Sequence, residues 1–98
     1  MTANPARGEA ELLGYVLRPS FTALVAAESE IGPLFGLVER AAAGALSLSD
    51  MVALFWHCIA ERPETLTREQ FSDGVVASGL ATATPALKVL LSQILQGR

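Results

Sequence analysis

The segment Leu87-Lys-Val-Leu-Leu-Ser-Gln-Ile-Leu95 decides the fold class, because its apolar residues recur at the spacing of an α-helix. They stand at positions 87, 90, 91, 94 and 95, and this i, i+3, i+4, i+7, i+8 order places them on one helical face. The polar residues that fall away from that face are Lys88, Ser92, Gln93 and Gln96. We therefore predict a final amphipathic helix that begins around Thr84-Pro85.

Two helices are predicted earlier in the chain from the residues that start and stop them. Ser20 offers an N-cap for a first helix with Phe21, Leu24 and Val25 at helical spacing, and this helix stops at Gly32. Pro33 then suits the first turn of a second helix that continues to Gly44. The apolar stripe of this second helix is Leu34, Leu37, Val38, Ala41 and Ala42.

Two more helices are predicted in the second half of the chain. Ser47 or Ser49 can cap a third helix, which we expect Arg62-Pro63 to end. Its apolar stripe is Met51, Leu54, Phe55, Cys58 and Ile59. Thr67 followed by Gln70 has the spacing of a capping box and predicts a fourth helix that stops near Gly79.

The segment from residue 9 to residue 18 reads as a short β-hairpin. Tyr15-Val16-Leu17 favours a strand, and Gly14 marks a turn. Leu13-Gly14 is a poor type I′ pair because leucine resists a positive φ. Two short strands are unstable alone, so we expect them to lean on the helices.

The whole chain of 98 residues is predicted to form one domain, mainly α, with four to five short helices and the N-terminal hairpin. Residues 1–8 have no periodicity and are expected to be a flexible arm, residues 9–18 the hairpin, and residues 20–96 the helical body. Because 51% of the residues are hydrophobic, we expect some apolar surface to be covered by a partner or by a second copy of the chain.

Charge and composition narrow the function classes. Seven basic residues stand against ten acidic ones, and the basic residues are spread along the chain, which argues against nucleic-acid binding. The longest apolar run, Met51–Trp56, is too short to cross a membrane, and no export signal precedes the helices. A single cysteine fits a reducing compartment, so we expect a bacterial cytoplasmic protein that makes no nucleic-acid or membrane contact.

No catalytic or metal site is expected from the residues. His57 and Cys58 are neighbours that point about 100° apart on a helix, so they cannot form a thiolate–imidazole pair with each other. Cys58 lies on the apolar stripe and is expected in the core, with His57 beside it. Glu28 and Glu30, like Glu61 and Glu64, are expected on solvated surfaces. We expect neither an enzyme, nor a cofactor, nor a metal.

Acyl carrier proteins are an acidic helical alternative, because in them a serine at a helix start carries a phosphopantetheine arm. That family has Asp-Ser-Leu, whereas this chain has Ser49 before Asp50. The order is reversed, and both Ser47 and Ser49 suffice as helix caps.

The stretches Asn4-Pro-Ala-Arg-Gly-Glu9 and Tyr15-Val-Leu-Arg-Pro-Ser-Phe-Thr-Ala-Leu24, followed by Glu28, resemble a family of small proteins of gene transfer agents and related phages. These proteins are similar to the tail assembly chaperones of long-tailed phages. The resemblance continues through Gly32, Leu34, Leu37, Arg40 and Asp50. It departs between residues 9 and 18, where this chain is shorter than the usual hairpin of the family.

The resemblance implies that the protein binds the helical tape-measure protein, keeps it soluble and helps tail-tube subunits to assemble around it. A small apolar-rich helical domain can mask apolar stripes by packing a helix into a groove. Our candidate contact is the last helix, with Leu87, Leu91, Ile94 and Leu95 as anchors; the same face can instead be the last wall of the core. Phe21 is either an anchor of the core or a partner contact, and Arg18 is either a solvated or locally paired charge or a partner contact.

Two other functions stay open at this point. The family has also been described as a tail-tube component, although tube subunits rely on extensive β-sheet and this chain offers one short hairpin. The remaining alternative is an acidic helical domain with a regulatory or DNA-binding role, which the absence of a basic cluster disfavours.

Overall fold

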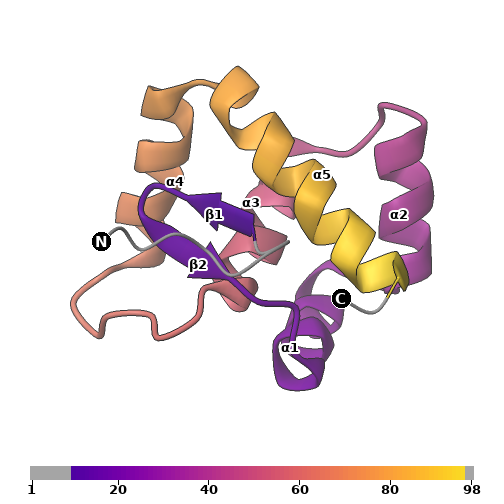
Figure 1. The fold of residues 1–98 in the computed structure, drawn as a ribbon, viewed down its shortest axis with the longest axis horizontal. Coiled ribbons are helices and arrows are strands. Elements are labelled where there is room, and N and C mark those ends of the chain that lie inside the picture. Colours follow the sequence, from indigo (N-terminus) through magenta and orange to yellow (C-terminus); the bar gives the residue numbers. More distant parts are fainter. Residues whose placement is uncertain (1–9, 97–98) are drawn as a thin grey trace.

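A computed structural model describes residues 10–96, and its helices and strands follow one another along the chain as Figure 1 shows. The strands are β1 (Ala10–Leu12) and β2 (Tyr15–Leu17). The helices are α1 (Phe21–Ile31), α2 (Leu34–Ala42), α3 (Leu48–Cys58), α4 (Arg68–Ser78) and α5 (Leu80–Gln96). The mainly α fold with an N-terminal hairpin is confirmed, whereas the arm predicted over residues 1–8 lies outside the described residues.

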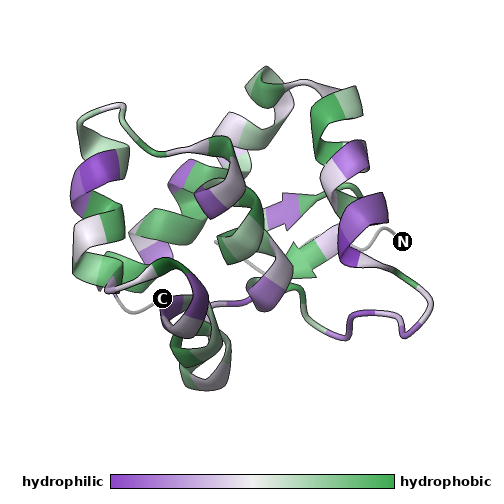
Figure 2. Cartoon of the chain, turned by 180° about the vertical axis from the view of Figure 1, so that it is seen from behind, coloured by the Kyte–Doolittle hydropathy of each residue, from purple (hydrophilic) through white to green (hydrophobic). Residues whose placement is uncertain are grey.

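Helix α3 forms the centre of the core. Its buried residues are Met51, Val52, Ala53, Leu54, Phe55 and Cys58. Helix α1 packs along α3, α4 packs against both α3 and α5, and α5 covers β1 (Figure 1). Figure 2 shows hydrophobic segments through the middle of the molecule and hydrophilic ones in the loop that leads into α4.

The hairpin has a two-residue turn, with Leu12 opposite Tyr15. Leu13 and Gly14 have φ values of 55° and 84°, both positive as a type I′ turn requires. Leu13 accepts this conformation because its side chain packs against α4 at Gly74. The contact is close, since a Cβ atom added to Gly74 would lie 3.1 Å from Leu13 Cδ1. The turn that the residue types disfavour is therefore held by a tertiary contact.

The outer edge of β2 is covered by the residues that follow α3. The Arg18 N–H donates to the Cys58 carbonyl at 2.7 Å, and the Ala60 N–H donates to the Val16 carbonyl at 2.8 Å. Leu17 and Ile59 form an antiparallel bridge between these bonds. Our prediction that α3 continues to Arg62-Pro63 is wrong, because Ile59 turns to an extended conformation to make this pairing.

The start of α5 is the largest difference from the predicted boundaries. We expected it around Thr84-Pro85, but the helix begins at Leu80 and contains Pro85. A proline inside a helix removes one backbone hydrogen bond. Ala83 and Ala86 are buried on either side of it, and packing of this turn against the core offsets that cost.

Helices α1, α3 and α4 start where the caps predict. The Ser20 hydroxyl accepts from the Ala23 N–H, the Ser47 hydroxyl accepts from the Asp50 N–H, and Thr67 and Gln70 form the predicted capping box. Helix α2 ends at Ala42, two residues before Gly44.

Among residues 10–96, no single helix is long and apolar enough to cross a membrane. Two pairs of consecutive helices, α1 with α2 and α4 with α5, reach that length and composition when each pair is taken together. The chain bends by 77° between α1 and α2 and by 111° between α4 and α5.

Candidate protein-binding groove

Helix α2 leaves most of its apolar side chains partly or fully open to solvent. Leu37 is its only buried residue, although the stripe predicted from the sequence has five apolar members. Phe35 is 82% exposed. A large exposed aromatic side chain on a half-covered helix is typical of a surface that another protein covers.

The exposed side of α2 faces the end of α5 across a groove of about 240 Å³. The residues that line it are Glu28, Leu34, Phe35, Val38, Ile94 and Leu95. Leu34 and Phe35 lie in the first turn of α2 and Val38 lies one turn later, while Ile94 and Leu95 lie in the last turn of α5. The groove is smaller than the roughly 300–1,000 Å³ of small-molecule sites, so it suits one or two apolar side chains.

Glu28 reaches this groove from the last turn of α1. Its Oε2 accepts a hydrogen bond of 3.0 Å from the Leu34 N–H, the first amide of α2. The N-cap residue Pro33 makes no side-chain cap of its own, so Glu28 caps α2 in its place. We expected Glu28 on a solvated surface; it is exposed, but its carboxylate is fixed at one end of the groove.

Glu30 forms a separate polar cluster with residues from two other helices. Its carboxylate accepts two hydrogen bonds from Arg68, of 3.0 and 2.5 Å, and lies 2.9 Å from His57 Nε2. The hydrogen bonds of Arg68 and then of His57 lower the pKa of Glu30 to about 2. This cluster joins α1, α3 and α4, so it stabilises the arrangement of the helices.

Cys58 has the environment of a core residue. It is 1% exposed, and burial raises the pKa of its thiol to about 12, so the thiol stays protonated at neutral pH. The His57 side chain is directed to Glu30, with Nε2 lying 2.9 Å from Oε1 of that carboxylate. The prediction of a core cysteine is confirmed.

Within residues 10–96, no group of three His, Cys, Asp or Glu side chains is close enough to hold a metal ion.

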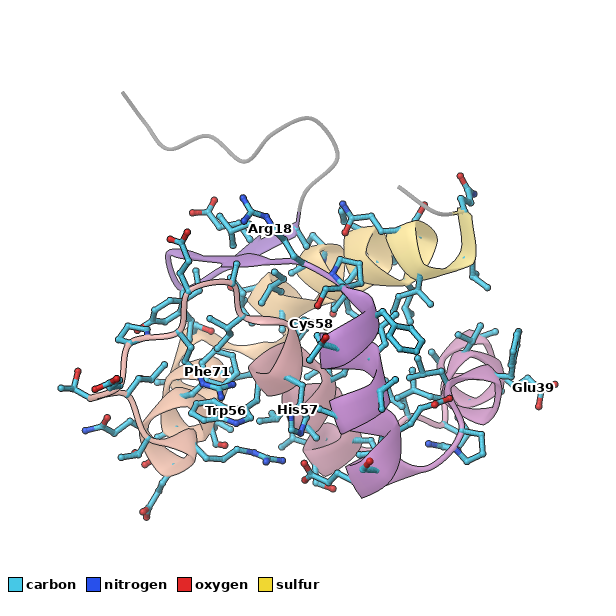
Figure 3. All side chains as sticks on the ribbon, turned by 90° about the horizontal axis from the view of Figure 1, so that it is seen from below. Arg18, Glu39, Trp56, His57, Cys58 and Phe71 are labelled. Atoms are coloured by element: carbon cyan, nitrogen blue, oxygen red, sulfur yellow. The ribbon has the colours of Figure 1, made fainter. Side chains whose placement is uncertain are left out.

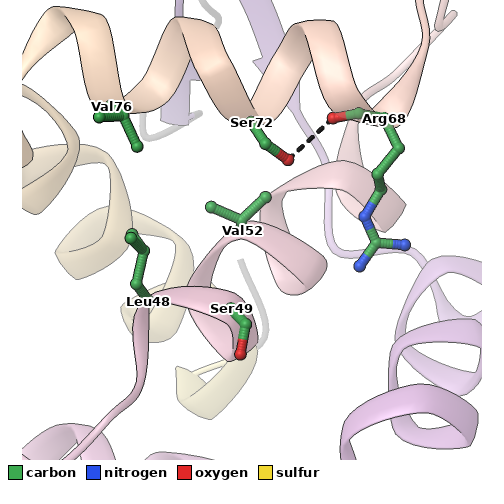
Figure 4. A pocket seen from close by; sticks show the side chains of 6 residues that line it. All are labelled: Leu48, Ser49, Val52, Arg68, Ser72 and Val76. Carbon is green, nitrogen blue, oxygen red and sulfur yellow. Dashed lines mark hydrogen bonds between the residues drawn. The ribbon is translucent and has the colours of Figure 1, made fainter.

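A second hollow, of about 270 Å³, lies between α3 and α4 (Figure 4). Leu48, Val52 and Val76 supply its apolar wall, with Ser49, Ser72 and Arg68 at its edge. The Ser72 hydroxyl donates to the Arg68 carbonyl at 2.8 Å, and the Arg68 guanidinium binds Glu30. Its polar groups therefore serve the fold, which makes it a weaker candidate than the groove between α2 and α5.

The residues that we predicted as partner contacts do not form one surface. Ile94 and Leu95 line the groove, whereas Leu87 and Leu91 do not. Leu87, Leu91 and Ile94 are all partly buried against the core. Gln93, expected to fall away from the apolar face, is 9% exposed, because α5 turns Ala83, Ala86, Leu90 and Gln93 inward.

Phe21 and Arg18 lie apart from the groove. Phe21 is 83% exposed at the start of α1, so the interpretation of this residue as a core anchor is wrong. Arg18 lines a different hollow beside the hairpin, together with Tyr15 and Glu61. Neither residue is among those that line the groove.

The family model described as "Phage tail tube protein, GTA-gp10" matches residues 13–97 of this chain. The chain belongs to this family. The match spans α1 to α5 and therefore includes both sides of the groove. The searches of curated proteins and of solved structures found no match. The resemblance to small tail proteins of gene transfer agents is thus confirmed at the level of the family.

Leu34, Phe35, Val38 and Glu28 were absent from the predicted contact residues. The stripe of the second helix already contained Leu34 and Val38, and both looked like ordinary core positions. The signal that could have found the groove was Phe35, a large aromatic residue next to the stripe rather than on it. Nothing in the spacing alone tells which helical face the core leaves open.

Proposed function

We propose that this member of the GTA-gp10 family is a non-catalytic tail assembly factor of the bacterial cytoplasm. It binds an apolar helical segment of another tail protein in the groove between α2 and α5. The partner that the family resemblance implies is the tape-measure protein, whose apolar stripes need cover before the tube encloses them. Tail-tube subunits are the partner at the next step of assembly.

The observation that supports this proposal most directly is the exposed apolar lining of the groove. Phe35 and Leu95, one from each side, are 82% and 59% exposed in the isolated chain. Apolar anchors flanked by polar surface carry much of the binding energy in protein interfaces. Two helices with a shallow apolar groove between them fit the helix-in-groove mode of recognition.

A structural subunit of the tail is the second candidate, and the family description favours it. A tube wall closes through long paired strands, whereas β1 and β2 have three residues each. In this second function the chain would stay in the finished particle beside the tube. A chaperone would leave.

Co-expression of this protein with the tape-measure and tail-tube proteins of the same genome, followed by affinity capture, tests the proposal. We expect the wild type to capture the tape-measure protein and Leu95→Asp to lose it. Leu80→Asp is the matched control, because Leu80 is 52% exposed on the same helix but lies outside the groove. Both variants should fold, as circular dichroism can check.

Two outcomes would contradict the proposal. Equal capture by the wild type and by folded Leu95→Asp would remove the groove from partner binding. Capture of neither tail protein would leave the assembly role without support. Quantifying this protein in purified particles separates the two candidates, since a structural subunit is abundant there and a chaperone is absent.

A further inference from the structure

The groove between α2 and α5 carries negative charge at one end. Of the described residues that line it, Glu28 alone is charged, and its Oε2 accepts a hydrogen bond from the Leu34 N–H. Among residues 10–96, no further donor binds its other carboxylate oxygen, Oε1. An oriented carboxylate beside an apolar lining favours a cation on whatever binds there.

The helix ends around the groove add to this charge. The C-terminus of α1 and the N-terminus of α2 meet at Gly32-Pro33, so their partial charges offset each other. The C-terminus of α5 is not offset in this way, and it places about half a negative charge on the last carbonyl groups of the helix. Over the described residues, neither α1 nor α5 has a basic residue in its last turn to neutralise these carbonyls.

The basic residues of α2 and α5 are Arg40 and Lys88, and neither of them lines the groove. Arg40 of α2 lies 3.1 Å from Asp50 of α3. Arg68 binds Glu30, and the Arg62 guanidinium lies 4.1 Å from the centre of the Trp56 ring. Glu39, the acidic residue of α2, points away from the body of the protein in Figure 3. The groove is therefore apolar and negatively charged, with no cation of the described chain lining it.

We infer that the groove selects an apolar helix that carries lysine or arginine beside its apolar stripe, and that Glu28 sets this preference. The inference rests on the proposed function, because it names the chemistry of the segment bound at the same site. A second copy of this chain is a poorer occupant, since each copy has a net charge of -3 and brings a like charge to the contact.

Two synthetic helical peptides of about 16 residues test this preference. They share one leucine stripe at i, i+3, i+4 and i+7, and differ only in having lysine or glutamate at the positions that flank it. Fluorescence anisotropy with the full chain should give tighter binding of the lysine peptide. Glu28→Gln keeps an oxygen for the Leu34 N–H and removes the charge, so it should reduce the preference about two- to fivefold.

Glu64→Gln is the matched control, because it changes the net charge equally but lies in the exposed loop before α4. It should leave the preference unchanged, whereas about 0.5 M salt should reduce it in the wild type. The preference should persist in Arg98→Ala, which removes the basic residue that follows α5 in the sequence.

The outcomes separate this inference from the proposed function. Equal binding of the two peptides, or equal effects of Glu28→Gln and Glu64→Gln, would overturn the charge preference. The groove would still be the binding site in that case if Leu95→Asp abolished binding of both peptides. Binding that Leu95→Asp leaves intact would overturn both. If the chain associates with itself and Leu95→Asp abolishes this association, a second copy of the chain occupies the groove. That result would also overturn the inference.

Discussion

Helices α2 and α3 are consecutive and both rich in apolar residues, yet the fold uses them in opposite ways. Helix α3 buries six of its side chains, with Phe55 at 0% exposure, whereas α2 buries Leu37 and leaves Phe35 82% exposed. Helix α1 packs along α3, and α4 lies against α3 as well. The position of a helix in the fold, rather than its composition, decides whether its apolar side chains stabilise the protein or remain open to a partner.

The largest test of this comparison is truncation of one phenylalanine in each helix. Phe55→Ala should lower the free energy of unfolding by about 3–5 kcal/mol, because it leaves a cavity in the core. Phe35→Ala should change it by no more than about 0.5 kcal/mol, because this side chain lies mostly in solvent. Urea denaturation of both variants gives the two values.

In partner binding, Phe35→Ala should have a larger effect than Phe55→Ala, the reverse of their order in stability. Phe35→Ala should weaken binding of an apolar helix in the groove by more than tenfold, as truncation of an aromatic anchor does. A large loss of stability in Phe35→Ala would contradict the comparison, since it would make α2 part of the core.

Truncation of Leu37 tests how strongly α2 is held to the rest of the fold. Leu37 is 0% exposed and is the buried anchor of this helix. Leu37→Ala should lower the free energy of unfolding by about 2 kcal/mol. This is the low end for such a change, because a short outer helix can shift to fill the space. The amide protons of α2 should then exchange faster, while those of α3 stay protected. Hydrogen exchange followed by NMR measures both. Val38→Ala, at a half-buried position, is the control; equal acceleration in α2 and α3 would mean that the two helices unfold as one unit.

Most of this fold could be predicted from local signals in the sequence. The caps at Ser20, Ser47 and Thr67 and the stop at Gly32 act over three or four residues, so they can be recognised without tertiary information. Two boundaries depend on distant contacts. Ile59 leaves α3 to pair with Leu17, and the turn before Pro85 is helical because Ala83 packs in the core.

The groove was only half predictable for a related reason. Ile94 and Leu95 could be found from the stripe of the last helix, but periodicity does not fix which part of a broad stripe faces the core. Residues from α1 and α2 complete the groove, and Glu28 lies 66 positions before Ile94 in the sequence. Contacts over such a separation follow from the packing of the whole chain. No local pattern encodes them.

Capping gives a smaller test, because α2 and α3 begin differently. The Ser47 hydroxyl accepts from the Asp50 N–H at 3.1 Å, while α2 depends on Glu28 from another helix. Ser47→Ala should cost about 1 kcal/mol of stability, the usual value of an N-cap. Ser49→Ala should be close to neutral, since the Ser49 hydroxyl lies near Ser47 and caps no amide. Thermal denaturation at neutral pH compares them; equal losses would mean that the cap contributes nothing specific.

The smallest expected effect concerns charge and distinguishes the two helices once more. Helix α3 is tied to α1 and α4 through Glu30, whereas α2 is tied to α3 through the Arg40–Asp50 pair. The pKa of Glu30 is lowered from 4.5 to about 2, so its carboxylate stabilises the fold above pH 4.5. This contribution is lost as the pH falls from 4.5 towards 2, because the carboxyl group gains a proton and releases Arg68 and His57.

Glu30→Gln should therefore cost about 1 kcal/mol or less at neutral pH, since both partners are partly exposed and solvent screens the pair. The variant has no proton to gain at this position, so its stability should fall less steeply than that of the wild type between pH 4.5 and 2. Urea midpoints measured at several pH values across this range give the two slopes, with Glu64→Gln as the exposed control. Identical slopes for the wild type and Glu30→Gln would mean that Glu30 does not hold α1, α3 and α4 together. The stability of the α3 side would then come from burial alone.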